Sequence, residues 1–218
     1  MSKLSLTFDP EQITRASYDN MADQYSRHTI GSRMRPAIQE ALKLSATMMR
    51  PGGRVLILGS GDGRDAAHFE DLGFQPVCLD FSHAMNVLAL KGHGLQLVTT
   101  GNMRRLPFGP LTFDGVWASM CMYHLPRTLM KSCLRAIRAV LRPGGAFYLN
   151  LRPGEGEKLE LTPASFPTGG PRYYTFYSER QLRALIKDFE VIRLCAIHPQ
   201  LGNYLIQAWL RVPTSEVL

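Results

Sequence analysis

The residues of this chain whose types and spacing could do chemistry are three closely spaced glycines and one aspartate. Gly59, Gly61 and Gly63 stand at alternate positions, and Asp80 follows Gly59 by 21 residues. Glycines allow a tight turn and keep side chains away from anything that the backbone approaches. A carboxylate at that distance can accept hydrogen bonds from both hydroxyls of a ribose. The pattern predicts a site for an adenosine-bearing cofactor.

These residues need a strand, a turn, a helix and a second strand to bring them together. The apolar run Val55–Leu58 is typical of a buried parallel strand. The sequence predicts a helix over Arg64–Leu72, stopped by Gly73, and a strand over Pro76–Leu79 that Asp80 closes. Later strands and helices alternate up to residue 150, which is the pattern of a doubly wound α/β sheet.

The glycine spacing separates two kinds of cofactor. A dinucleotide pyrophosphate favours G-x-G-x-x-G, whereas this chain has G-x-G-x-G and places Arg64 where that pattern needs glycine. A nicotinamide oxidoreductase is therefore the disfavoured alternative. The loop resembles the first motif of the class I S-adenosylmethionine (SAM) methyltransferases, in which it curls around the methionine moiety and binds no phosphate.

Four further segments carry the same resemblance, which covers roughly residues 50–212. They are GNMRRLPF (Gly101–Phe108), FDGVWASMCMYHLP (Phe113–Pro126), LRPGGAFYLNL (Leu141–Leu151), and a tail with a helix at Ser178–Lys187 and strands at Phe189–Ile197 and Tyr204–Val212. The resemblance implies a Rossmann-like, seven-stranded, mostly parallel sheet that ends in an antiparallel hairpin. It also implies SAM as the cofactor and S-adenosylhomocysteine as its product.

The resemblance assigns cofactor contacts to particular positions. Ser119 and its neighbours would face the sulfonium. Asn102 stands where the family usually has an acid that accepts a hydrogen bond from the adenine amino group, and its amide oxygen can accept that bond without charge. The implied cofactor-binding residues are Tyr25, Gly59, Ser60, Gly61, Asp62, Asp80, Phe81, Met85, Asn102, Met103 and Ser119.

One position departs from the family. Its first strand usually carries an acid two residues before the first glycine, which helps to order the methionine ammonium group, and this chain has Ile57 there. Two explanations stay open. Either another group replaces the acid, with Asp62 close in sequence, or the affinity for the cofactor is reduced.

The methyl acceptor would be met by residues after the fourth strand and near both ends of the chain. His124 is the candidate catalytic base, because the ordinary pKa of histidine suits proton removal near neutrality. The alternative is a histidine that only hydrogen-bonds its own loop. The candidate substrate contacts are Tyr18, Tyr123, Arg172 and Tyr174, and simple packing is the competing explanation for the tyrosines.

Two segments would complete the site within a single domain of 218 residues. Residues 9–48 are predicted to form a helical lid, with helices from Pro10 to about Tyr25 and over Met34–Met48, and Tyr18–His28 resembles the family's cofactor lid. Residues 152–177 are predicted to be an insert without regular structure that serves as a substrate loop. Its aromatic residues either wall a pocket or pack into the core.

The composition argues against a membrane-spanning, secreted or metal-binding protein. No run of residues has the length of a membrane span, and the chain starts without a signal-peptide pattern. The four cysteines are widely spaced without a C-x-x-C pair, and the histidines lack metal-ligand spacing, so we expect no metal and a reduced, cytoplasmic setting. The pattern leaves the oligomeric state open.

The net charge of +7 is concentrated in residues 101–152, which hold eight basic residues and one acid. Five of them recur at helical spacing, which is typical of the solvated face of an amphipathic helix. We therefore expect SAM-dependent methyl transfer to an oxygen or nitrogen nucleophile of a small molecule by in-line displacement. The alternatives are an RNA or protein methyltransferase that uses the basic surface, and a non-catalytic SAM-binding protein.

Overall fold

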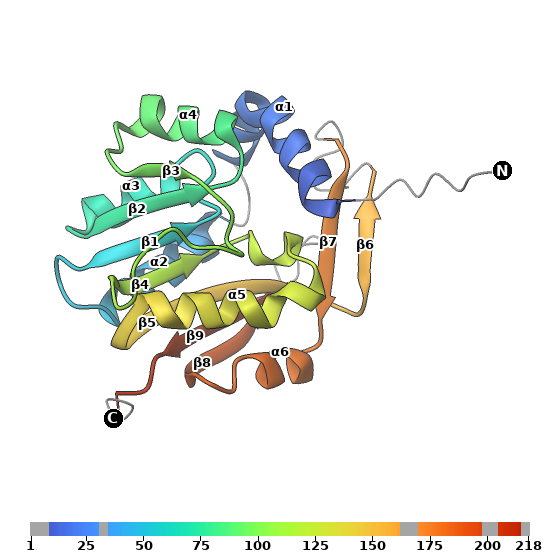
Figure 1. Ribbon diagram of the computed structural model, residues 1–218. Helices are drawn as coiled ribbons and strands as arrows, with labels where there is room; N and C mark the ends of the chain where they lie inside the picture. Colours follow the sequence, from blue (N-terminus) through green and yellow to red (C-terminus); the bar gives the residue numbers. More distant parts are fainter. Residues whose placement is uncertain (1–8, 31–34, 162–169, 198–204, 215–218) are drawn as a thin grey trace.

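A parallel sheet with an antiparallel edge forms the centre of the molecule. The computed structural model describes residues 9–30, 35–161, 170–197 and 205–214. The strand order β3-β2-β1-β4-β5 is parallel throughout; β9 runs antiparallel to β5, and β8 antiparallel to β9. This confirms the predicted doubly wound sheet with a C-terminal antiparallel hairpin (Figure 1). The bounds are β1 Arg54–Leu58, β2 Gln75–Asp80, β3 Val98–Thr100, β4 Phe113–Ala118, β5 Leu141–Pro153, β8 Glu190–Ile197 and β9 Leu205–Arg211.

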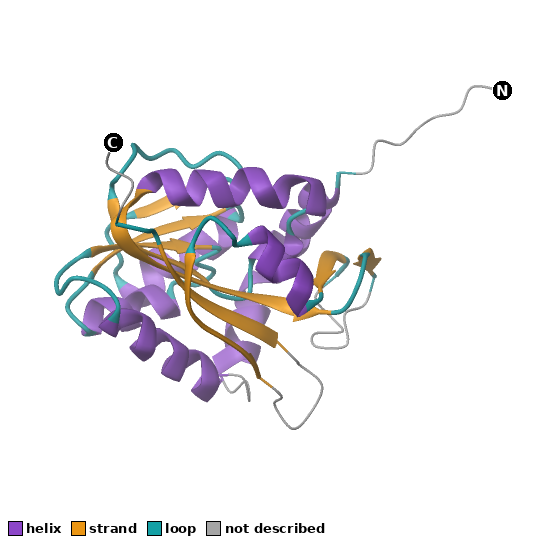
Figure 2. Ribbon diagram, turned by 90° about the horizontal axis from the view of Figure 1, so that it is seen from below, coloured by secondary structure: helices purple, strands orange, loops and turns teal. Residues whose placement is uncertain are grey.

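Helices cover both faces of this sheet (Figure 2). Alternate residues of β1 enter different apolar clusters: Leu56 packs with α5 and α6, and Ile57 with α2, α3 and α4. Burial on both faces explains why Val55–Leu58 are all apolar. No helix in the described residues is long and apolar enough to cross a membrane. The bounds are α1 Pro10–Ile30, α2 Arg35–Thr47, α3 Arg64–Asp71, α4 His83–His93, the short 3-10 helix η1 Met122–His124, α5 Arg127–Val140 and α6 Glu179–Leu185.

The segment predicted to be an insert without regular structure contains two strands. β6 (Glu157–Glu160) and β7 (Arg172–Tyr177) form an antiparallel pair, and β7 joins the end of β5 through Arg152 and Pro153. The prediction is therefore wrong for the described part of 152–177, and residues 162–169 lie outside it. The run RYYTFY has the aromatic content typical of strands, and its flanking glycines and prolines concealed that signal.

The basic helix α5 is amphipathic, as its spacing predicts. Met130, Leu134 and Ile137 are buried in the core, and Arg135 is exposed. Arg127 does more than face solvent, because it donates a hydrogen bond to Gln181 Oε1 at 3.0 Å and lies 4.5 Å from the ring of Tyr177. Part of the predicted basic surface therefore fastens α5 to the C-terminal region.

A buried carboxylate ties together the starts of β1, β4 and β5. Asp114 accepts a hydrogen bond from the backbone N–H of Arg54 at 2.8 Å and forms ion pairs with Arg142 at 2.7 Å and Arg50 at 3.3 Å. Burial acts to raise the pKa of Asp114, but the hydrogen bonds from Arg54 and Arg50 and the charge of Arg142 hold it below its usual value.

We expect Asp114→Asn to lower the free energy of unfolding by about 1–2 kcal/mol near neutral pH, since it removes charge from these hydrogen bonds. Because the folded pKa is depressed, this stabilisation is complete above the unfolded pKa and is lost as the pH falls through the folded value. Urea denaturation at several pH values measures the difference. The exposed Arg135→Gln is the control, and equal stability of Asp114→Asn and the parent near neutral pH would contradict the prediction.

Candidate functional site

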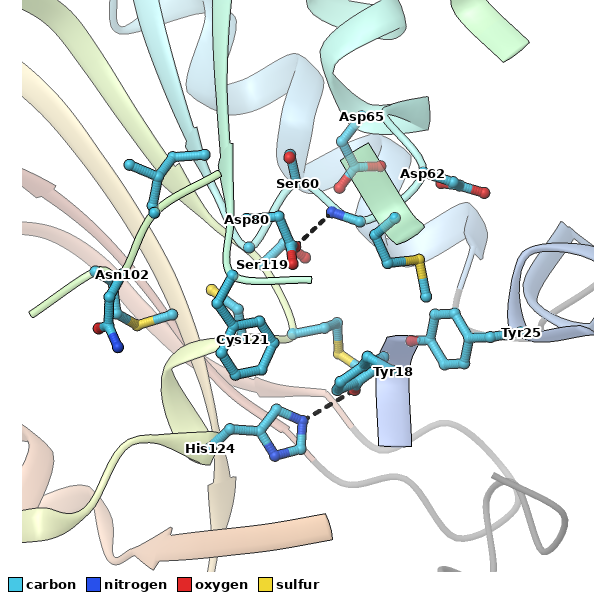
Figure 3. A pocket seen from close by; sticks show the side chains of 18 of the residues that line it. Tyr18, Tyr25, Ser60, Asp62, Asp65, Asp80, Asn102, Ser119, Cys121 and His124 are labelled. Atoms are coloured by element: carbon cyan, nitrogen blue, oxygen red, sulfur yellow. Dashed lines mark hydrogen bonds between the residues drawn. The ribbon is translucent and has the colours of Figure 1, made fainter. Parts of the chain in front are cut away.

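One cavity lies at the carboxyl ends of β1, β2 and β4, beneath α1 (Figure 3). α1 is fastened on both sides. Asp19 accepts hydrogen bonds from the Ser82 hydroxyl at 2.7 Å and the Ala84 N–H at 3.2 Å, and the Ser17 hydroxyl donates to the carbonyl of Pro171 at 2.6 Å. α1 thus spans from α4 to β7 over the cavity, the placement that a lid would need. From α2, Ile38 also lines the cavity.

The glycine turn between β1 and α3 forms one wall. The backbone N–H of Gly59 donates to the carbonyl of Leu79 at 2.8 Å, which brings the turn against β2. Gly59 has a φ of +59°, and a Cβ there would lie 2.3 Å from the Cβ of Cys121. Gly61 also has a positive φ, but a Cβ at this position would meet no atom within 4 Å. Glycine is required at 59 for space and is favoured at 61 by the backbone conformation.

Asp80 lies at the end of β2, opposite this turn. Its Oδ2 accepts a hydrogen bond from the N–H of Gly61 at 2.9 Å, and its Oδ1 accepts one from the N–H of Ser82 at 2.8 Å. Burial raises the pKa of Asp80 to about 6, although these two N–H groups act to lower it. A carboxylate oxygen can accept more than one bond, so the donor and acceptor chemistry suits a diol in the cavity.

The structure brings the predicted cofactor-binding residues together. All of them line this one cavity: Tyr25, Gly59, Ser60, Gly61, Asp62, Asp80, Phe81, Met85, Asn102, Met103 and Ser119. They come from α1, the glycine turn, the end of β2, α4 and the loops after β3 and β4. Spacing along the chain could not show that they share one enclosure.

Both polar atoms of the Asn102 side chain have hydrogen-bond partners within the protein. Its Oδ1 accepts a hydrogen bond from the N–H of Arg104 at 2.9 Å, and its Nδ2 donates to both carboxylate oxygens of Glu11 at 3.3 Å. The amide oxygen already accepts one bond within its own loop, and its role as the acceptor for adenine stays a prediction. The carboxylate at this end of the cavity comes from α1.

Asp62 is not placed to replace the acid missing at Ile57. It forms an ion pair with Arg64 and accepts a hydrogen bond from the hydroxyl of Ser26. Burial acts to raise its pKa, but these partners hold the pKa of Asp62 below its usual value. The carboxylate is therefore committed to joining α1 to the start of α3.

Asp65, on the first turn of α3, is a second carboxylate at this wall of the cavity. Its Oδ2 accepts a hydrogen bond from the indole N–H of Trp117 at 2.9 Å, and it lines the cavity. Trp117 on β4 is the register partner of Ile57 on β1, and both side chains enter the same apolar cluster. The Asp65 carboxylate is thus hydrogen-bonded to the residue that pairs with Ile57, the position where the family's strand would carry its acid.

His124, in η1, faces the cavity from the other side. Its Nδ1 lies 2.6 Å from the carbonyl oxygen of Tyr173, and because a carbonyl only accepts, Nδ1 carries the proton. The unprotonated Nε2 accepts a hydrogen bond from the Tyr18 hydroxyl at 3.0 Å, drawn as a dashed line in Figure 3. Burial, aided by the charges of Arg172 and Arg152, lowers the pKa of His124 to about 3. The expectation of a pKa near neutrality is therefore wrong, and this imidazole is neutral.

The candidate substrate contacts divide into two groups. Tyr18 lines the cavity, whereas Tyr123, Arg172 and Tyr174 are buried behind its wall. The guanidinium of Arg172 lies 5.7 Å from the ring centre of Tyr18, and the ring of Tyr174 lies 4.8 Å from that of His124. This corrects the prediction of direct contact for these three, since packing against Tyr18 and His124 keeps them from the cavity. These three residues position Tyr18 and His124, which do line the cavity.

Several lining residues were missed by the sequence analysis. Glu11 and Ile38 come from the N-terminal helices, Asp65 from α3, and Met120 and Cys121 from the loop after β4. Met120 has a φ of 59°, an uncommon conformation for a residue with a side chain, and its N–H donates to Asn150 Oδ1 at 2.8 Å. Met120 and Cys121 had a nearby signal, because they follow Ser119, and Asp65 lies two residues after the glycine motif. Glu11 and Ile38 depend on contacts distant in sequence.

Comparisons with known proteins match this chain to methyltransferases. Residues 56–149 match the family model of the methyltransferase domain. The chain is 27% identical over 219 residues to a demethylmenaquinone methyltransferase of Streptomyces avermitilis, covering 100% of this chain and 87% of that protein. It is 29% identical over 186 residues to a demethylmenaquinone methyltransferase of Renibacterium salmoninarum, covering 85% of this chain and 72% of that one.

Solved structures share the fold. One is the 1,6-didemethyltoxoflavin-N1-methyltransferase of Burkholderia thailandensis with bound 1,6-didemethyltoxoflavin and S-adenosylhomocysteine, at a TM-score of 0.73 and 22% identity, covering 96% of this chain and 92% of that one. Another is the magnesium protoporphyrin IX methyltransferase of Synechocystis PCC 6803 with bound SAM, at a TM-score of 0.74 and 14% identity, covering 95% and 99%. The family model, the relatives and the shared fold together support a class I SAM-dependent methyltransferase, an enzyme whose cofactor is S-adenosylmethionine.

Proposed function

We propose that the chain transfers the methyl group of SAM to an oxygen or nitrogen nucleophile of a small molecule bound beside Tyr18 and His124. One observation carries this proposal. A single cavity under α1 has the Asp80 carboxylate in one part and the Tyr18–His124 pair in another. A donor and an acceptor molecule can therefore be held side by side in one enclosure.

The residues around the glycine turn suit the cofactor. Asp80 would accept hydrogen bonds from the ribose hydroxyls, and the backbone from Gly59 to Gly61 would lie along the methionine moiety. Asp65 would face the ammonium group in place of the acid absent at Ile57. This arrangement supports the first of the two explanations for Ile57, replacement of the acid by another group.

When bound, SAM would supply a methyl group on positively charged sulfur, open to attack by an acceptor lone pair in line with the S–C bond, with S-adenosylhomocysteine as the leaving group. The protein's main task is orientation, which can contribute about 7–11 kcal/mol. α1 also keeps water out, because the hydrogen bonds of Asp19 and Ser17 hold it against α4 and β7. No covalent intermediate with a side chain is needed.

The neutral His124 can still take a proton. A hydroxyl oxygen that has gained a methyl group is positively charged, and its proton is then strongly acidic. An imidazole whose pKa is about 3 is basic enough to accept that proton, either directly or through the Tyr18 hydroxyl. A methylated amine holds its proton far more tightly, so this pair favours an oxygen acceptor over a nitrogen acceptor.

The enclosure favours a small acceptor over RNA or protein. The described residues that line the cavity include apolar side chains such as Phe81, Met120 and Leu125 and none from the basic helix α5. A polymer held on the α5 surface would therefore not be continuous with the site. The relatives named demethylmenaquinone methyltransferases make a reduced demethylmenaquinone the carbon acceptor to test against the phenols and amines, because menaquinone differs from it by a methyl group on a ring carbon.

The test is an acceptor screen with methyl-labelled SAM. The panel holds small phenols, small amines, a reduced demethylmenaquinone analogue and transfer RNA. We expect label in a small molecule, and mass spectrometry with NMR identifies the atom that carries it. Label on carbon alone would refute the oxygen-or-nitrogen assignment, and label in RNA without any in the small molecules would refute the small-molecule proposal.

A further inference from the structure

A carboxylate from α1 reaches the loop after β3. Glu11, in the first turn of α1, accepts hydrogen bonds from Asn102 Nδ2 at 3.3 Å and forms an ion pair with Arg104 at 2.8 Å. Its side chain is 12% exposed, against 44% for Arg104. Glu11 and Asn102, which are 91 residues apart in the sequence, thus belong to one polar cluster at the cavity.

The cluster has a defined direction of hydrogen bonding. Asn102 Oδ1 accepts from the backbone N–H of Arg104 at 2.9 Å, which leaves its Nδ2 as the group turned toward Glu11. An amide nitrogen only donates, so it cannot accept a bond from an amino group. Glu11 is an acceptor with several lone-pair directions, and it lines the same cavity as Phe81 and Met103.

We propose that Glu11, and not residue 102, accepts the hydrogen bond from the exocyclic amino group of the cofactor's adenine. This inference rests on the proposed placement of the cofactor, with its ribose on Asp80. Asn102 and Arg104 are positioning residues that orient the Glu11 carboxylate. Because Glu11 belongs to α1, recognition of the base and closure of the helix over the cavity become one event.

Burial also affects the protonation of Glu11. It raises the pKa of the carboxyl group above its usual value, while the charge of Arg104 and the hydrogen bond from Asn102 act to lower it. A partly desolvated carboxylate gains more from each added donor than an exposed one does. An amino group arriving from the cavity is such a donor.

The experiment compares two ligands that differ at one position. S-adenosylhomocysteine carries the amino group, and S-inosylhomocysteine carries a carbonyl oxygen in its place. We expect the parent protein to bind the adenosine ligand about 10- to 100-fold more tightly, the range for one hydrogen bond to a charged group. In Glu11→Ala this preference falls to nearly onefold, and calorimetric titration measures all four dissociation constants.

Control variants show whether Glu11 recognises the adenine amino group or only attaches α1 to the loop after β3. Glu40→Ala removes an exposed acid from α2 and keeps the preference. If Glu11→Ala weakens both ligands by the same factor, Glu11 only fastens the helix and the inference is overturned. If the parent protein binds neither ligand, the proposed function fails together with the inference.

Discussion

Asp80→Ala is expected to weaken the binding of S-adenosylhomocysteine by at least about 100-fold, because two hydrogen bonds to a charged group are lost. The same change leaves the N–H groups of Gly61 and Ser82 without the acceptor that now orders the glycine turn. Isothermal titration measures the loss, and a thermal melt of the variant shows whether the fold is retained. Binding within about threefold of the parent would remove Asp80 from the site.

The pKa of Asp80 adds a second readout to the same prediction. Burial raises this pKa to about 6, and the ribose hydroxyls bind the ionised form. Affinity for the product is therefore complete above that value and falls as the pH drops below it, because a proton must leave before the ligand can bind. Asp80→Asn is the control, since its weaker binding has no such titration. Affinity that stays flat in the parent between about pH 5 and 8 would contradict this assignment.

His124→Gln is expected to lower kcat by about 100-fold or more for an oxygen acceptor, the usual range for loss of a general base. Glutamine can still accept a hydrogen bond from the Tyr18 hydroxyl through its side-chain oxygen, but it cannot take a proton. The affinity for S-adenosylhomocysteine should stay close to that of the parent. The measurement is steady-state kinetics with the small acceptor found in the screen.

Two comparisons make this result specific. His124→Asn keeps a donor for the Tyr173 carbonyl and loses the contact with Tyr18, so it should be at least as slow as His124→Gln. In the parent, His124 contributes no titration to kcat near neutral pH, because its pKa is about 3. An unchanged kcat in both variants would show that His124 only supports its loop.

The sequence predicted the part of the site that is formed by residues close together in the chain. The glycine turn and Asp80 belong to one strand–turn–helix–strand unit, so their spacing alone predicts a ribose-binding arrangement. The alternation of strands and helices likewise predicts the doubly wound sheet. Both depend on contacts within a few tens of residues.

The remainder depends on contacts that no spacing encodes. The pKa of His124 is set by burial beside Arg172 and Arg152, which come from the segment expected to lack structure. Proximity in sequence pointed to Asp62 as the replacement for the missing acid. The structure instead pairs Asp62 with Arg64, and it bonds Asp65 to Trp117, which pairs with Ile57 on the neighbouring strand.

The most direct test of the account is a crystal structure of the protein with S-adenosylhomocysteine. We predict that the ribose hydroxyls lie on the Asp80 carboxylate, that the adenine reaches Glu11, and that the sulfur faces the side of the cavity where Tyr18 and His124 meet. A ligand whose ribose is bound away from Asp80, or whose sulfur is separated from Tyr18 and His124, would contradict the central claim that one cavity under α1 holds both the methyl donor and its acceptor.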